Sequence, residues 1–389
     1  MNRSLLLLAV AATLLAAAPA AEAASRHVPR GFYGVMWDRA AAASPDADQT
    51  GLWNLMARSG VESTRTEFSW ARAQPEAGRP PSFAATDPVV ALAAARNIRL
   101  LPVVMATPAW AARDPSRGRR SPPARSSDYT AYLGALVGRY GPNGTFWKER
   151  PDVPRRPLRE WQIWNEPHLD VYWHAQGDDG SAWASEYVAL LRESKRTIKS
   201  IDPGATVVLA ALADASWRVL TTLYRAGVRG SFDVAAINIF TARPGFVIAA
   251  TRLVRRVLRR EREPRKPIWV TETTFPAGKG RVTRPPLSWQ QNWYTTDRGM
   301  AKRLRVLYHL GLRNRRRLRL GRIYWYTWAS GYDGQNDLFE YAGLVRYGSS
   351  LSPQPALTAY RRSARRAQGC RKTAAGVCGQ ISRRRPAGG

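Results

Sequence analysis

The sequence predicts an α/β protein with the (β/α)8 fold, a TIM barrel in a single domain with long βα loops. Eight short stretches rich in apolar residues recur along the chain, and helical patterns or long loops separate them. Several of these stretches are almost continuously apolar, which is typical of parallel strands buried on both faces. The length of 389 residues also suits one barrel with insertions, since such barrels run from roughly 200 to more than 400 residues.

Each strand and helix is expected at a defined place. Strands are predicted at residues 31–37, 61–68, 98–105, 158–164, 205–212, 232–240, 267–272 and 322–328. Helical patterns are predicted at residues 87–97, 128–141, 182–202 and 217–227, and in two arginine-rich stretches at 252–263 and 313–322. Strands and helices that alternate in this way are typical of a (β/α)8 barrel, and there is no sequence repeat of fixed period.

The first residues predict an exported protein. A basic start precedes an apolar run at residues 5–18 and an Ala-x-Ala site at residues 21–23. This is the pattern of a signal peptide, residues 1–23, cleaved near Ala23. The apolar run is short for a membrane span, but an uncleaved N-terminal anchor is the alternative. No second long apolar run follows, so we expect a secreted mature protein, with cell-wall association as a further option, and no membrane partner after cleavage.

The barrel is expected to occupy residues 31–362. Two of its βα loops are long, at residues 106–127 and 273–297. Loops of this kind surround the functional site of a barrel, because the site lies at the C-terminal ends of the strands.

The end of the chain has a different composition. From about Arg361 it is rich in Arg, Ala and Gly, and residues 363–389 are predicted to form a basic, weakly ordered tail. The two cysteines of the chain, Cys370 and Cys378, both lie there. In an exported protein they could form a disulfide, and two unpaired thiols are the alternative.

The net charge of +31 bears on partners rather than on fold. Three interpretations are open: a solvated basic surface, adhesion to an anionic cell-wall polymer, and nucleic-acid binding. The charge is spread along the chain and concentrated in helices, not in a recognised nucleic-acid-binding module. We therefore expect no specific nucleic-acid partner and keep the anionic polymer as a candidate partner.

Two glutamates stand at the C-terminal ends of predicted strands. The stretch WQIWNEPHL places Asn165 and Glu166 directly after the fourth strand, and PIWVTETTF ends the seventh strand on Glu272. Taken alone, each glutamate would be read as a solvated loop residue. The pair, after two β-rich runs with aromatic flanks, favours catalysis, because hydrolysis of a glycosidic bond requires two carboxyl groups that flank the bond.

These two motifs resemble those of the large clan of retaining glycoside hydrolases built on a (β/α)8 barrel, in a xylosidase-like or cellulase-like branch. The resemblance covers roughly residues 31–362, although its specific motifs occupy few positions. It implies that Glu166 is the acid/base, that Asn165 binds the 2-hydroxyl of the sugar, and that Glu272 is the nucleophile.

The resemblance also implies supporting residues. Arg65, at the end of the second strand, would contact the nucleophile, and a cation there favours an ionised carboxylate. Trp328, at the end of the eighth strand, would form the floor of the sugar site, since indole rings bind the apolar faces of sugars. Trp37, near the end of the first strand, is a further substrate-binding candidate, with core packing as the alternative.

The sixth strand departs from the pattern of the clan. Many members carry His and Tyr near its end, where the tyrosine hydroxyl bonds the nucleophile. Here Asn238 and Phe240 occupy those positions. Phe240 has no hydroxyl, so Asn238 or another group would orient Glu272, and Tyr326 and Tyr332 are possible substitutes.

No cofactor or metal is expected, because the sequence has no zinc-protease, nucleophile-elbow, P-loop or dinucleotide-binding motif. We predict a monomeric, secreted retaining glycoside hydrolase that cleaves β-O-glycosidic bonds in polysaccharide or oligosaccharide by double displacement. The alternative is a catalytically degenerate barrel that binds carbohydrate or an anionic cell-wall polymer. The loops, rather than these motifs, decide the sugar and the linkage.

Overall fold

The eight-stranded sheet of the computed structural model is parallel throughout. The structure describes residues 26–37, 49–175, 182–282, 292–331, 339–347 and 352–370. The strands are β1 Tyr33–Met36, β2 Ser63–Ser69, β3 Arg99–Met105, β4 Glu160–Ile163, β5 Thr206–Val208, β6 Ala235–Asn238, β7 Ile268–Thr273 and β8 Leu320–Tyr326. Their order is β5-β4-β3-β2-β1-β8-β7-β6. Parallel bridges from Val208 to Val234 and from Leu212 to Ile237 join the two edges. The predicted (β/α)8 barrel is confirmed.

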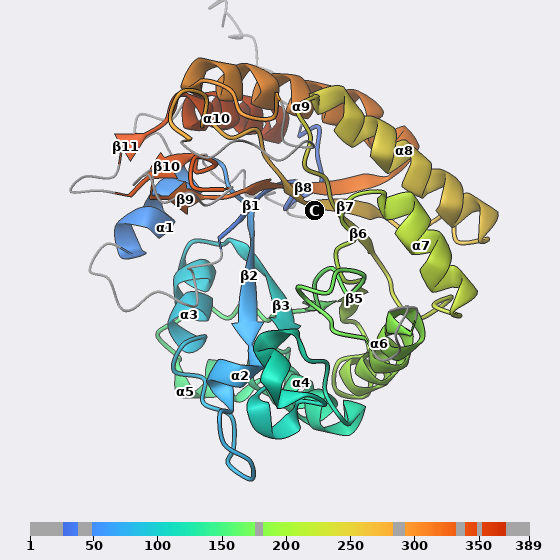
Figure 1. Cartoon of the computed structure of the whole chain (residues 1–389). Helices are drawn as coiled ribbons and strands as arrows, with labels where there is room; N and C mark the ends of the chain where they lie inside the picture. Colours follow the sequence, from blue (N-terminus) through green and yellow to red (C-terminus); the bar gives the residue numbers. More distant parts are fainter. Residues whose placement is uncertain are drawn as a thin grey trace, which may run out of the picture.

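The helices form an outer ring around the strands (Figure 1). They are α1 Gln49–Arg58, α2 Trp70–Ala73, α3 Asp87–Ala95, α4 Ser126–Tyr140, α5 Thr145–Glu149, α6 Trp183–Ile201, α7 Ser216–Arg225, α8 Pro244–Arg260, α9 Asp297–Leu318 and α10 Pro355–Gln368. The loop between β3 and α4 contains two 3-10 helices, η1 Ala109–Ala111 and η2 Pro115–Arg120. After β8, three short strands, β9 Ala329–Ser330, β10 Val345–Arg346 and β11 Ser352–Pro353, form a second sheet.

Several predicted boundaries were wrong even though every predicted strand is present. β5 has only 3 residues and β6 only 4, because the apolar runs around them continue as buried chain outside the sheet. Apolar composition reports burial and does not by itself report strand pairing. The helix predicted at residues 313–322 ends at Leu318, and β8 begins at Leu320, two residues before the predicted start.

Helix α9 shows how a strongly basic stretch still forms a buried element. The side chain of Thr296 caps its first turn by accepting a hydrogen bond from the Gly299 amide at 3.1 Å. Arginines occupy its last turn, where they interact favourably with the helix dipole. One face is buried, through Met300, Ala301, Leu304, Leu307, Tyr308, Gly311 and Leu318.

The prediction of a weakly ordered tail at residues 363–389 was wrong for residues 363–368, which form the end of α10. This helix buries Ala356, Leu357, Ala359, Tyr360, Ala364 and Ala367. The ring of Tyr360 packs against Tyr33 of β1 and Tyr308 of α9, with ring centres 5.7 and 5.5 Å apart. Small alanines supply most of the buried face, so the apolar periodicity was hidden by the arginines between them.

The ends of the chain are described only in part. Cys370 is disulfide-bonded, and Cys378, the only other cysteine of the sequence, lies outside the described residues. The predicted signal peptide also lies outside them. Within the described ranges, no helix is long and apolar enough to cross a bilayer.

The barrel interior is layered from one end to the other. Near the N-terminal ends of the strands, Glu160 of β4 accepts two hydrogen bonds from Arg322 of β8, both at 2.5 Å. The guanidinium of Arg322 also lies over the ring of Trp269, 3.9 Å from its centre. Above this ion pair an apolar layer follows, made of Leu101, Val208, Ala211, Val234, Ala236, Trp269 and Tyr324.

Candidate active site

A buried arginine joins the residues at the C-terminal end of the barrel. The Arg65 side chain, on β2, is only 1% exposed. Its Nη1 donates to Oε1 of Glu272 at 2.5 Å, and its Nη2 donates to Oδ1 of Asn165 at 2.8 Å. Its Nε donates to Oε1 of Gln162 at 2.7 Å, and Met36 Sδ lies 3.2 Å from Nη1. The predicted contact between Arg65 and Glu272 is therefore present.

A second amide connects to the other glutamate. Asn238 Nδ2 donates to Oε1 of Glu166 at 2.5 Å and lies 3.4 Å from Oδ1 of Asn165. Its own Oδ1 accepts a hydrogen bond from the Thr271 hydroxyl at 2.8 Å, which fixes the orientation of the amide. The sequence had left open whether Asn238 or another group orients Glu272; in the structure the Asn238 side chain contacts Glu166.

The backbone at the end of β4 brings Asn165 and Glu166 into one cluster. Successive side chains of a regular strand point to opposite faces of the sheet. Here Trp164 has φ +69° and Glu166 has φ +44°, both in the left-handed region. That conformation costs roughly 1–2 kcal/mol for a residue with a Cβ. The turn is held by hydrogen bonds from the Trp164 amide to Val104 O and from the Glu166 amide to Ala211 O, both 3.0 Å. This turn lets the side chains of Asn165 and Glu166, which are adjacent in sequence, both contact Asn238.

The two carboxyl groups experience opposite environments. Burial, the negative charge of Glu272 and the negative charge of Asp214 raise the pKa of Glu166. The hydrogen bond from Asn238 and the charge of Arg65 oppose this shift, and the resulting pKa is about 8. Glu166 is therefore protonated at neutral pH and can donate a proton. Glu272 is held in an ion pair with buried Arg65, which favours its ionised form. Two carboxyl groups of which one environment favours the protonated form and the other the ionised form are typical of an acid and a nucleophile.

The two tryptophans expected to bind sugar are buried instead. Trp328 is 0% exposed, and its indole nitrogen has no hydrogen-bond partner among the described residues. Trp37 is 2% exposed, and its nitrogen donates to the Tyr347 hydroxyl at 2.7 Å. Neither ring presents a face to a ligand in this arrangement. The partly exposed ring at the end of β8 is that of Tyr326.

Phe240 forms an apolar wall beside this site. Its ring centre lies 6.0 Å from Tyr326, 4.9 Å from Phe339 and 5.9 Å from Trp293. Sequence reasoning treated Phe240 only as a missing hydroxyl, and the structure shows that it packs in an aromatic cluster. Tyr332, named as a possible substitute, lies outside the described residues.

Four residues of the site were missed by the sequence reasoning: Met36, Gln162, Asp214 and Thr271. Gln162 carried a signal, because a polar side chain inside the apolar stretch WQIW must find a buried partner. Thr271 and Met36 fit an ordinary strand, and Asp214 follows an apolar run with no distinguishing pattern. In the described part of the chain, no group of three or more His, Cys, Asp or Glu side chains could hold a metal ion.

The fold is similar to that of solved glycoside hydrolases. A family 39 glycoside hydrolase from the gut symbiont Bacteroides cellulosilyticus WH2 has a TM-score of 0.63 and 19% identity, covering 86% of this chain and 63% of its own. A monomeric beta-xylosidase from Caulobacter crescentus CB15 has a TM-score of 0.63 and 17% identity, covering 88% and 69%. The family 1 β-glucosidase from Thermotoga maritima has a TM-score of 0.59 and 9% identity, covering 88% and 99%.

No protein-family model and no curated protein matches the sequence. This chain spans 63% of the length of the family 39 enzyme, which is less than two thirds. At these identities the likeness concerns the fold. In fold, this chain resembles the (β/α)8-barrel glycoside hydrolases.

Proposed function

We propose that the protein is a retaining glycoside hydrolase that cleaves β-O-glycosidic bonds in polysaccharide or oligosaccharide. The observation that carries this proposal is the contrast between two buried carboxyl groups. Glu166 has a pKa of about 8, whereas Glu272 is ion-paired with Arg65 at 2.5 Å. Such a contrast supplies one proton donor and one anionic nucleophile.

In the first step, Glu272 attacks the anomeric carbon and forms a carbon–oxygen bond to it. The bond between that carbon and the leaving oxygen breaks, and Glu166 transfers its proton to the leaving oxygen. Arg65 holds the Glu272 carboxylate and Asn165 together, so the nucleophile and an amide for the sugar are positioned by one side chain.

In the second step, the now ionised Glu166 accepts a proton from water. The water oxygen bonds to the anomeric carbon, and the ester bond to Glu272 breaks. The configuration at the anomeric carbon is retained after two displacements. Asn238 donates to the Glu166 carboxylate in this ionised state, which stabilises it as a base.

The neighbours in fold support a proposal for the substrate class. Two of the structures above are a beta-xylosidase and a β-glucosidase. We propose a neutral β-linked sugar, with xylosides tested first. Aryl β-xylosides, glucosides, mannosides and arabinosides form the first panel, followed by product analysis on xylan, mannan, glucan and arabinan oligomers.

The decisive variants are Glu166→Gln and Glu272→Gln. Each is expected to lower kcat/KM on the best aryl glycoside by at least about a thousandfold. Glu67→Gln is the control. Glu67 also lies near the C-terminal end of a barrel strand, β2, but its carboxylate is ion-paired with Arg119. If wild type turns over no glycoside and both variants still bind polysaccharide, the degenerate binding barrel replaces this proposal.

Rescue of variants by azide tests the retaining mechanism independently of glycosidase activity. In Glu272→Gly, azide is expected to attack the anomeric carbon directly and yield an α-glycosyl azide. In Glu166→Ala, azide is expected to attack the glycosyl-enzyme and yield a β-glycosyl azide. Formation of neither product, in an enzyme that hydrolyses glycosides, would remove the covalent intermediate.

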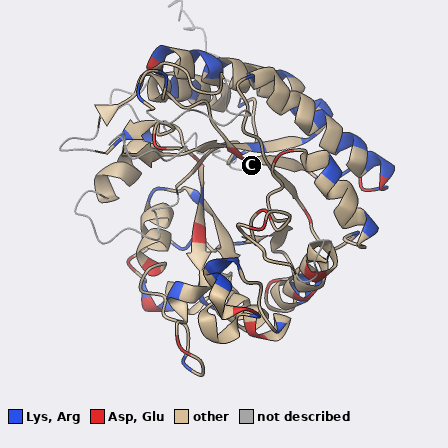
Figure 2. Cartoon of the chain, viewed as in Figure 1, with Lys and Arg blue, Asp and Glu red and all other residues tan. Residues whose placement is uncertain are grey.

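Export, a monomeric state and an anionic polymer partner are part of the same proposal. The sequence of residues 1–23 supports export, and N-terminal sequencing of the secreted protein tests it. Sedimentation of the mature protein tests whether it is a monomer. The basic outer faces of α8 and α9 support adhesion to a cell-wall polyanion (Figure 2).

A further inference from the structure

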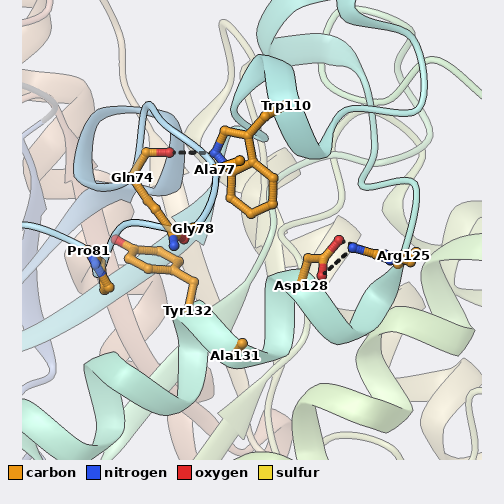
Figure 3. A pocket seen from close by; sticks show the side chains of 9 residues that line it. All are labelled: Gln74, Ala77, Gly78, Pro81, Trp110, Arg125, Asp128, Ala131 and Tyr132. Atoms are coloured by element: carbon orange, nitrogen blue, oxygen red, sulfur yellow. Dashed lines mark hydrogen bonds and ion pairs between the residues drawn. The ribbon is translucent and has the colours of Figure 1, made fainter.

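A cavity of about 530 Å³ lies on the flank of the barrel. It opens between the loop that follows α2 and the outer helix α4, and Trp110 of η1 closes its side (Figure 3). Its apolar walls are Ala77, Gly78, Pro81, Trp110, Ala131 and Tyr132. None of the residues in the cluster around Glu166 lines it.

Buried aromatic rings stand between this cavity and the candidate active site. Tyr132 stacks on Trp70 with ring centres 6.1 Å apart, and Trp70 contacts Tyr129 at 5.9 Å. Tyr129 in turn contacts Trp164, next to Asn165, at 6.1 Å. Trp70, Tyr129 and Trp164 are each 0% exposed. The cavity is therefore a separate feature and not an extension of the catalytic centre.

Trp110 gives the cavity a rigid aromatic face. Its indole nitrogen donates to the Gln74 carbonyl at 2.9 Å, so the only polar group of the ring is already bonded. Its ring also contacts Trp70 edge-on at 5.5 Å. The ring is only partly buried, and Figure 3 shows it bordering the same space as Tyr132. An aromatic face fixed in this way binds the apolar face of a sugar with little loss of conformational entropy.

A paired charge stands across the cavity from this ring. Arg125 donates to both carboxylate oxygens of Asp128, at 2.9 and 3.2 Å. Because the pair is neutral overall, the cavity does not select a charged ligand. The pair retains free N–H groups and oxygen lone pairs, which can bond two adjacent hydroxyl groups.

Tyr132 adds an unsatisfied polar group. Its side chain lines the cavity and is only 2% exposed, and its hydroxyl has no hydrogen-bond partner in the part of the chain that the structure describes. A buried hydroxyl without a partner is unfavourable.

We propose that this cavity binds one pyranose unit of a neutral polysaccharide chain, at a site separate from the catalytic centre. The choice of a neutral sugar rests on the proposed function, whereas the cavity, the aromatic face and the neutral polar pair do not. The site holds the polymer at the flank of the barrel while another segment of the chain reaches Glu166.

The first variant fills the cavity without removing any core contact. Ala131 is an exposed residue of α4 that lines the cavity, so Ala131→Tyr blocks it. Gly138→Tyr is the matched control, because Gly138 is exposed on the same helix and no atom lies within 4 Å of a Cβ added there. Trp110→Ala is the second variant, which removes the aromatic face itself.

All variants are made in full-length Glu272→Gln protein, so that turnover does not consume the probe. Their retardation is measured by electrophoresis in gels that contain soluble xylan, mixed-linkage glucan or galactomannan. We expect Ala131→Tyr and Trp110→Ala to weaken binding to one of these polymers by roughly five- to tenfold, as expected for the loss of one stacked ring. Gly138→Tyr should bind as the parent does.

Equal retardation of the parent, Ala131→Tyr and Trp110→Ala would overturn the proposal, and so would a parent that none of the three polymers retards. Activity of the same cavity variants with an intact Glu272, on a small aryl glycoside, separates this idea from the proposed function. That activity should equal wild type, because the cavity does not contact the reacting sugar. Cavity-dependent binding by a protein that hydrolyses no glycoside would support the cavity site and reject only the proposed function.

Discussion

Asn238 donates a hydrogen bond from Nδ2 to Oε1 of Glu166 at 2.5 Å, and the Thr271 hydroxyl donates to Oδ1 of the same amide. An Nδ2 group can only donate, so Oε1 must remain an acceptor. The acidic proton of Glu166 is therefore placed on Oε2. Asn238 thus decides which oxygen of Glu166 carries the proton, a task distinct from orienting Glu272, the proposed nucleophile.

The first prediction concerns this amide. Asn238→Leu removes a hydrogen bond that lowers the pKa of Glu166, so that pKa should rise. The basic limb of the pH profile of kcat/KM should move to higher pH, and kcat should fall by roughly ten- to a hundredfold because the proton is no longer confined to one oxygen. Asn314→Leu, on the outer helix α9, is the control. A basic limb at the wild-type pH would show that Asn238 does not act on Glu166.

A second prediction has the opposite sign. The charge of Asp214 raises the pKa of Glu166, so Asp214→Asn should lower it. The basic limb of kcat/KM should then move to lower pH, from its wild-type position near the pKa of about 8. Asp170→Asn is the control, since the Asp170 side chain is 61% exposed and its charge is not among the largest influences on the pKa of Glu166. Identical profiles for both variants would contradict the assigned role of Asp214.

The sequence predicted the barrel and the two glutamates because both leave local signals. A buried parallel strand is apolar along its whole length, and WNEP and WVTE interrupt two such strands at their ends. The contact of Arg65 with Glu272 was predicted because the strand that carries Arg65 was readable, but Arg65 is the third residue of β2 Ser63–Ser69 and does not end it. No pattern in the chain showed that Gln162 would share this arginine, since that contact depends on the register between β2 and β4.

The failures have a common physical origin. A tryptophan at the end of a strand can face the ligand or the core, and residues distant in sequence decide which. Tyr347 and Trp53 cover Trp37, and the chain after β8 folds back into a small sheet beside Trp328. The cavity beside Trp110 likewise brings together a loop after α2 and one face of α4, which no local pattern connects.

A third prediction links catalysis to stability. Because the pKa of Glu166 is about 8 in the folded protein and 4.5 ordinarily, the fold retains a proton that the unfolded chain releases between these values. The stability that the folded protein has while Glu166 is neutral is fully present below pH 4.5 and is lost as pH rises to about 8. Glu166→Gln cannot ionise and avoids the loss.

The free energy of unfolding of Glu166→Gln should therefore exceed that of wild type increasingly as pH rises, by up to about 1.4 kcal/mol per pH unit inside this window. Urea unfolding at pH 5, 6.5 and 8 measures it, with Glu76→Gln on an exposed loop as control. Two stability curves that run parallel across these pH values would contradict the prediction.

The fourth prediction concerns the opposite end of the barrel. Glu160→Gln leaves the Arg322 guanidinium, whose side chain is 6% exposed, without its carboxylate partner. Breaking a buried pair in this way should lower the free energy of unfolding by about 3–5 kcal/mol. The activity of the folded fraction should not change, because function lies at the other end of the strands.

Asp152→Asn is the matched control for Glu160→Gln. It breaks the ion pair with Arg150, in which the two side chains are 44% and 62% exposed, and should have little effect on unfolding. A loss of stability of the same size in both variants would show that the Glu160 pair has no special contribution.

The last prediction tests the basic surface. Helix α8 carries three exposed arginines that form no ion pair with a described residue, namely Arg252, Arg256 and Arg259. The mature protein should bind a polygalacturonate column at low salt and elute as salt rises, because exposed charges are screened. Replacing all three arginines by glutamine should lower the eluting salt concentration. The control replaces three exposed arginines on α6 and α7, namely Arg192, Arg196 and Arg225. Elution of the two triple variants at the same salt concentration would show that binding depends on total charge and not on the arginines of α8. Tighter retention on duplex DNA than on polygalacturonate would favour a nucleic-acid partner.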